Sequence, residues 1–65
     1  MKKLLASAPT KEELEKLINE YFASQNYVIT DMNRVRNLKT GYTPNNLIIS
    51  IRGNKWRLYR EDHND

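Results

Sequence analysis

The sequence predicts a single α+β domain in which one N-terminal amphipathic helix packs on an antiparallel sheet of three or four strands. Two observations predict this fold class. Apolar residues recur with a helical period in the first part of the chain, and the period changes to two from residue 27 onward. A chain of 65 residues has room for one small domain. We expect that domain at residues 10–60, between a loosely held N-terminal tail at residues 1–9 and an acidic C-terminal tail at residues 61–65.

A helix is predicted from about residue 11 to residue 24. Thr10 and Glu13 have the spacing of a capping box, in which the threonine hydroxyl accepts from a first-turn N–H and the glutamate reaches back. The apolar side chains that follow share one helical face: Leu14, Leu17, Ile18, Tyr21 and Phe22. This pattern fades near Asn26, which can adopt the left-handed conformation that ends a helix.

The first predicted hairpin lies directly after the helix. Residues 27–30 and 34–37 alternate as short strands around the triplet Asp31-Met32-Asn33, whose last residue tolerates a positive φ. Residues 38–46 then form the longest loop, because one Gly and one Pro interrupt any regular pattern.

The second predicted hairpin has the clearest strand signal. Residues 47–52 and 55–60 flank Gly53-Asn54, a connection that suits a two-residue hairpin turn. In that register Ile51 opposes Trp56, so we expect the tryptophan in the core. The inner face is then apolar, with Leu47, Ile49, Ile51, Trp56 and Leu58. The outer face carries Ile48, Ser50, Arg52, Lys55, Arg57 and Tyr59.

The first hairpin is expected to have two faces in the same way. The residues directed inward are Tyr27, Ile29 and Val35. The residues directed outward are Val28, Thr30, Arg34 and Arg36. The two hairpins can therefore extend one basic surface. Leu38 shares the parity of the outward cations, so either a bulge lies near Asn37 or this register is wrong by one residue.

The positive charge belongs to the predicted sheet. The chain has a formal net charge of +3, but residues 1–26 are neutral, with four Lys and four Glu. Residues 27–60 carry seven Lys or Arg and one Asp, a net charge of +6, while residues 61–65 carry three acids. Five of the seven sheet cations are Arg, whose planar guanidinium can bind phosphate through two N–H groups at once.

These cations form a candidate nucleic-acid site. A sheet face can hold nucleic acid by placing cations on phosphates and an aromatic ring against an unstacked base. The candidate phosphate partners are Arg34, Arg36, Arg52, Lys55 and Arg57. Tyr59 is the candidate stacking platform, and Tyr42 on the long loop is a second aromatic. The competing interpretation is a solvated face whose cations prevent edge-to-edge aggregation.

The leading hypothesis is therefore a small non-enzymatic binding protein that contacts nucleic acid backbone through a basic sheet face. The alternative is a protein–protein interaction module or homodimer with no nucleic-acid role. Val28 and Ile48 are apolar residues at outward-facing positions, and such residues mark a partner surface or a dimer seam.

Other function classes find no support in the residues. The chain has no Cys, which excludes disulfides and thiolate zinc sites and fits a cytoplasmic location. His63 is the only histidine and has no second imidazole or thiol to complete a metal site. Two glycines are too few for a glycine-rich phosphate loop, and no segment can span a bilayer. We expect no enzymatic activity, cofactor, metal, membrane association or small-molecule substrate.

Two segments and the composition carry a resemblance to known proteins. The helix start Thr10-Lys11-Glu12-Glu13, the terminal segment of residues 52–60 and the eight Asn are similar to features of small accessory proteins of conjugative transposons and phages of low-GC Gram-positive bacteria. This resemblance implies an interaction protein, because such accessory proteins act as regulators, inhibitors or DNA-associated factors more often than as catalysts.

Overall fold

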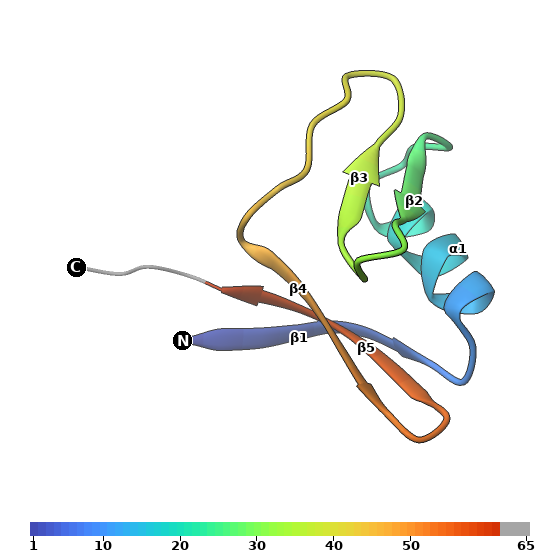
Figure 1. The fold of residues 1–65 in the computed structure, drawn as a ribbon, viewed down its shortest axis with the longest axis vertical. Helices are drawn as coiled ribbons and strands as arrows, with labels where there is room; N and C mark the ends of the chain where they lie inside the picture. The colour runs from blue at the N-terminus through green and yellow to red at the C-terminus, as the bar shows by residue number, and fades with distance from the viewer. Residues whose placement is uncertain (62–65) are drawn as a thin grey trace.

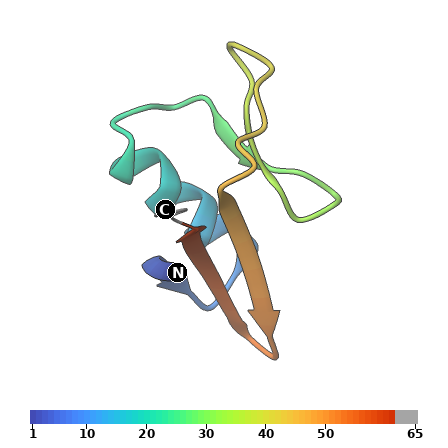
Figure 2. The ribbon, with the colours of Figure 1, turned by 90° about the vertical axis from the view of Figure 1, so that its left-hand side faces the viewer.

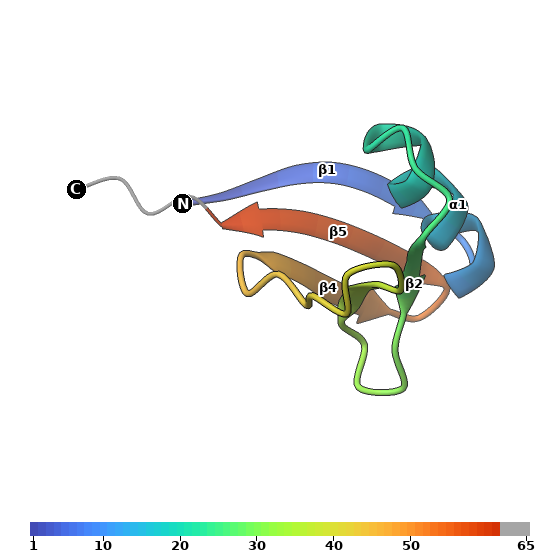
Figure 3. The same ribbon diagram turned by 90° about the horizontal axis from the view of Figure 1, so that it is seen from above.

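The computed structural model describes residues 1–61, which form one helix and five strands (Figure 1). The elements are β1 (Lys2–Ala8), α1 (Lys11–Tyr21), β2 (Tyr27–Ile29), β3 (Val35–Asn37), β4 (Leu47–Arg52) and β5 (Lys55–Glu61). An antiparallel sheet has the order β1-β5-β4, with β5 between the other two (Figure 3), and β2 pairs with β3 in a separate sheet. The predicted α+β class, with one helix packed on a three-stranded sheet, is confirmed.

The N-terminal segment is a strand, so the expectation of a loosely held tail at residues 1–9 is wrong. β1 pairs antiparallel with β5, from Lys2 opposite Glu61 to Ala8 opposite Trp56. The register shifts between Leu4 and Ala6, which leaves Leu5 as an extra residue on β1. The strand begins with two lysines followed by two leucines, which is why a period of two is not visible in the sequence.

The helix begins where the capping pattern predicts. Thr10 is the N-cap, and its hydroxyl oxygen accepts a hydrogen bond of 3.1 Å from the backbone N–H of Glu13. Leu14 and Ile18 are the fully buried residues of the helix. The apolar stripe therefore faces the core as the spacing requires.

The helix ends at Tyr21, three residues earlier than predicted. Ser24 donates its N–H to the carbonyl of Asn19 at 2.9 Å, and Ala23 donates to Glu20 at 3.2 Å. This pair of bonds is a Schellman motif, which needs a left-handed residue at the position of Ala23. Ala23 has that conformation, with φ at 51°, so the assignment of this role to Asn26 is wrong.

Both hairpins have the predicted registers. Ile51 opposes Trp56 across the β4–β5 turn, where Gly53 has φ at 59°, as the first position of a type II′ turn requires. Ile29 opposes Val35 in the β2–β3 hairpin, and Asn33 in its turn has φ at 59°. β3 ends at Asn37, so Leu38 lies outside the strand. The parity that Leu38 shares with the outward cations therefore does not conflict with this register.

The core lies between the three-stranded sheet and a layer made of α1 and the β2–β3 hairpin. Its buried side chains come from every element: Ala8, Leu14, Ile18, Ile29, Val35, Leu47 and Leu58. Trp56 packs against this cluster as expected. The turn of the β4–β5 hairpin extends beyond the helix (Figure 2), and Ile51 near that turn keeps 39% of its surface exposed. Within residues 1–61 the helix is too short and too polar to cross a membrane.

Side chains of α1 also bind the backbone of β2. Glu15 accepts the N–H of Ile29 through Oε2 at 3.0 Å. Asn19 accepts the N–H of Tyr27 at 2.8 Å and donates to the carbonyl of the same residue at 3.0 Å. The helix thus supplies hydrogen-bond partners for the backbone groups of β2 that do not pair with β3.

Candidate nucleic-acid interface

The outer face is the face of the three-stranded sheet that is turned away from the core. α1 and the β2–β3 hairpin pack on the opposite face, through the core side chains named above. Residues directly opposite each other in an antiparallel sheet point to the same side, so the pairings define which residues share the outer face. Those residues form rows across the strands.

Two rows cross all three strands. Leu4, Tyr59 and Ile48 form an apolar row, with the tyrosine on the central strand. Ser7, Arg57 and Ser50 form the next row, which places a hydroxyl on each side of the arginine. Alternate residues along a strand are about 7 Å apart, so the guanidinium row lies directly beside the aromatic row.

Cations surround these rows. Arg52 and Lys55 oppose each other beside the hairpin turn, and Lys2 lies at the other end opposite Glu61. Arg52, Lys55 and Lys2 are exposed, whereas Arg57 is half-buried among its neighbours. Within residues 1–61 the outer face thus has four cations and one acid, and the glutamates of α1 lie on the other side of the core.

Four of the six predicted site residues are therefore together. Arg52, Lys55 and Arg57 share the outer face with Tyr59, as the hairpin register predicts. β1 adds Lys2, Leu4 and Ser7 to this face, a contribution that the sequence did not predict. The sequence carried no period-two signal for β1, because it begins with two lysines followed by two leucines.

Arg34 and Arg36 do not belong to the rows of this face, although Arg34 lines a hollow beside β4 together with Ile48. Arg36 is exposed on β3, and the Val35 beside it faces the shared core, so the arginine points away from the three-stranded sheet. Arg34 donates from one guanidinium nitrogen to the carbonyl of Pro44 and to Oδ1 of Asn45, both at 3.4 Å. The expectation that the two hairpins extend one basic sheet face is wrong, because β2 and β3 form a separate sheet that packs on the core through Ile29 and Val35.

The apolar residues of the alternative hypothesis are separated in the same way. Ile48 belongs to the apolar row of the outer face, whereas Val28 lies on β2, opposite Arg36. The two side chains therefore do not form a common seam.

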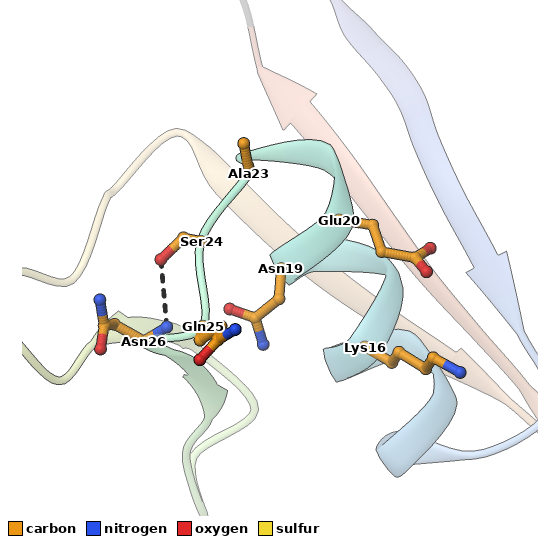
Figure 4. Close-up of a pocket in the computed structure, with 7 residues that line it drawn as sticks. All are labelled: Lys16, Asn19, Glu20, Ala23, Ser24, Gln25 and Asn26. Carbon is orange, nitrogen blue, oxygen red and sulfur yellow. Dashed lines mark hydrogen bonds between the residues drawn. The ribbon is translucent and has the colours of Figure 1, made fainter.

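A hollow of about 700 Å³ lies at the end of the helix (Figure 4). Its polar groups hold the chain together: the hydroxyl of Ser24 accepts the N–H of Asn26 at 3.1 Å, and Asn19 binds β2. Lys16 and Glu20 point away from the loop that carries Ser24. This arrangement has a structural role and brings no nucleophile to a base.

The part of the chain that the structure describes holds no group of three His, Cys, Asp or Glu that could bind a metal ion. His63 and most of the predicted acidic tail lie outside the described residues, while Glu61 is the last residue of β5.

No protein-family model, curated protein or solved structure matches this chain.

Proposed function

We propose that this protein is a small non-enzymatic binding protein whose outer face contacts single-stranded nucleic acid. The observation that supports this function is the row of Ser7, Arg57 and Ser50 directly beside the row that contains Tyr59. An open sheet with cations next to a central aromatic ring offers both contacts that a single strand needs.

Each residue has a distinct role in this proposal. Arg57 binds a phosphate, and the hydroxyls beside it donate further hydrogen bonds to the same group. Arg52 and Lys55 bind the next phosphates toward the hairpin turn. Tyr59 stacks on a base, and Leu4 and Ile48 provide apolar contact on each side of the ring.

The test is the affinity for single- and double-stranded oligonucleotides as a function of salt. Three to four phosphate contacts give a slope of about −2 to −3 in a plot of log K against log salt for single strands. The double variant Arg52→Glu with Arg57→Glu is expected to lose at least about tenfold in affinity at low salt. No binding at low salt, or binding that the double variant leaves unchanged, would sink the proposal.

A matched control separates local contacts from overall charge. Lys11→Glu with Lys16→Glu changes the net charge by the same amount, but both residues lie on α1, across the core from the outer face. This control is expected to retain most of the affinity. An equal loss in both double variants would indicate nonspecific attraction and would contradict a site on the outer face.

A second candidate function is supported by the apolar row. Leu4 keeps 51% of its surface exposed beside Tyr59 and Ile48, and such a row can bind a protein partner or a second copy of the chain. Sedimentation at several concentrations tests self-association: a monomer at all concentrations argues against the homodimer. A Leu4→Lys variant should dissociate any dimer formed through this row.

The proposed setting is the cytoplasm of a bacterium that carries a mobile genetic element. It follows from the lack of Cys and from the resemblance described above. Fractionation of cells that express the tagged protein checks the location.

A further inference from the structure

The edge of β4 that faces away from β5 is open. β4 is an outer strand of the three-stranded sheet (Figure 3), and Asn46, just before it, accepts the N–H of Glu61 at 2.8 Å. Because backbone groups alternate in direction along an antiparallel strand, the even-numbered residues of β4 bond to β5 and the odd-numbered ones point away. Within residues 1–61 no backbone hydrogen bond joins these outward groups to the β2–β3 hairpin. The residues of this open edge are Leu47, Ile49 and Ile51.

The open edge lacks the features that usually prevent the addition of another strand. β4 has no proline and no bulge against β5, and its one charged residue, Arg52, stands next to the turn. The other edge of the sheet, β1, carries two lysines and the bulge at Leu5. The sheet is therefore protected at β1 and accessible at β4.

A hollow of about 370 Å³ lies beside the open edge. The turn of the β2–β3 hairpin contributes Met32 and Arg34 to its lining, and β4 contributes Leu47 and Ile49. Met32 keeps 82% of its surface exposed. A strand added along the open edge would pass through this hollow and cover the methionine.

Arg34 gives the hollow a positive charge that has no acid beside it. Its Nη2 donates to the carbonyl of Pro44 and to Oδ1 of Asn45 at 3.4 Å, which is long for a hydrogen bond, and its buried Nε has no hydrogen-bond partner. Both of these partners are neutral, and none of the residues within 1–61 that line the hollow is acidic. A carboxylate that enters the hollow can form a charge-assisted hydrogen bond with the guanidinium.

We propose that the open edge binds an extended acidic segment of a protein partner, which adds an antiparallel strand to the sheet beside β4. A second copy of β4 is less complementary. A symmetric pair of β4 strands centred on Ile49 places Arg52 of one copy opposite Asn46 of the other, at the end of the strand where Arg34 lies. Two cations then share each end of the seam, whereas an acidic segment compensates Arg34.

The register of the sheet specifies the pattern of the bound segment. Leu47 and Ile49 face the core side of the sheet, so the residues that pair with the open edge point to that side as well. Apolar residues opposite Ile51 and Ile49 would cover the isoleucine that is 39% exposed, and an acid opposite Leu47 would reach Arg34. In an antiparallel strand this order is apolar, any residue, apolar, any residue, acidic.

The first test uses the full chain and a synthetic peptide with this pattern, Ser-Val-Thr-Val-Thr-Glu-Ser, acetylated and amidated at its ends. Binding is measured by fluorescence anisotropy of the labelled peptide and by amide hydrogen exchange of the protein. The peptide is expected to slow the exchange of Ile49 and Ile51 about tenfold or more, whereas Ile48 and Ser50 are already protected by β5. A peptide with Gln in place of Glu should bind about fivefold more weakly or worse.

Two matched pairs locate the contacts. N-methylation of the second Val removes an N–H that faces β4 and should weaken binding about tenfold, whereas N-methylation of the Thr after it changes a group that faces away and should have little effect. Arg34→Gln is expected to weaken binding of the Glu peptide about fivefold or more and to leave the Gln peptide unaffected. Arg36→Gln, the control, removes one charge at an exposed position of β3 and should retain the affinity.

Four results would overturn the proposal. They are no protection of Ile49 and Ile51 by the peptide at about 1 mM, equal affinity for the Gln peptide, equal loss in the two arginine variants, and protection without peptide that rises with protein concentration. The last result would place a second copy of the chain on the open edge. None of the four bears on the nucleic-acid proposal, because the open edge and Arg34 are separate from the rows of the outer face.

Discussion

The carboxamide of Asn19 bonds both backbone groups of Tyr27, with Oδ1 accepting the N–H at 2.8 Å and Nδ2 donating to the carbonyl at 3.0 Å. A neighbouring strand would make the same pair of bonds. The helix thus acts as the third member of the β2–β3 sheet, and one side chain fixes the position of the small sheet on the helix.

Replacement of Asn19 should therefore destabilise the fold. Asn19→Leu leaves two half-buried backbone groups without their partner, and we expect the free energy of unfolding to fall by about 2 kcal/mol. Urea denaturation followed by the fluorescence of Trp56 measures this change. The matched control is Gln25→Leu, an equivalent change at an exposed position, which should alter stability by less than about 0.5 kcal/mol. Similar values for the two variants would contradict the role of Asn19.

Ala23 offers a stabilising substitution. Its φ of 51° disfavours any residue with a Cβ, whereas glycine adopts this conformation freely. We expect Ala23→Gly to raise the free energy of unfolding by about 1 kcal/mol and the melting temperature by about 4–8 °C. Gln25→Gly, two residues away and without a positive φ, should lower both quantities, as glycine does where its freedom is not needed. A lower melting temperature for Ala23→Gly would contradict the Schellman geometry.

The pairing of β1 with β5 can be tested with two neighbouring residues. Ala8 is buried against the core and Ser7 is exposed on the outer face. Ala8→Asp places a carboxylate in apolar surroundings, so we expect a loss of about 3 kcal/mol or more, enough to unfold a domain of this size. Ser7→Asp should remain folded. The dispersion of amide signals in a ¹H–¹⁵N spectrum distinguishes the two states. A loosely held tail would tolerate both changes.

Tyr59 should contribute to nucleic-acid binding through its ring. Tyr59→Ala is expected to weaken the binding of a single-stranded oligonucleotide by about tenfold or more, because stacking on one base is worth about 1–3 kcal/mol. Tyr59→Phe keeps the ring and should retain most of the affinity. Far-UV circular dichroism confirms that both variants are folded. If Phe is as damaging as Ala, the hydroxyl and not the ring makes the contact.

The sequence predicted those parts of the fold that depend on neighbouring residues. Gly53-Asn54 determines the register of β4 and β5, so the grouping of Arg52, Lys55, Arg57 and Tyr59 followed from local spacing. The position of Arg36 did not follow from local spacing, because the packing of Ile29 and Val35 on the core determines how the two sheets face each other.

Two further features of the fold were not predicted. β1 was missed because its first four residues, two lysines and two leucines, do not alternate, and because its partner is at the other end of the chain. The exposure of the aromatic rings at the end of the helix was missed because Tyr21 and Phe22 have the spacing of core residues. The helix ends there, however, so their rings lie at the border of the core, where Tyr21 keeps half of its surface exposed.

The place of β5 in the sheet order determines when the protein can fold during its synthesis. β5 is the last of the described strands to leave the ribosome, yet it is the strand with which both β1 and β4 pair. Until residue 61 has been added, the nascent chain has no three-stranded sheet on which the helix can pack. The core therefore assembles late, through contacts between distant parts of the chain, and the apolar residues of β4 stay uncovered until then.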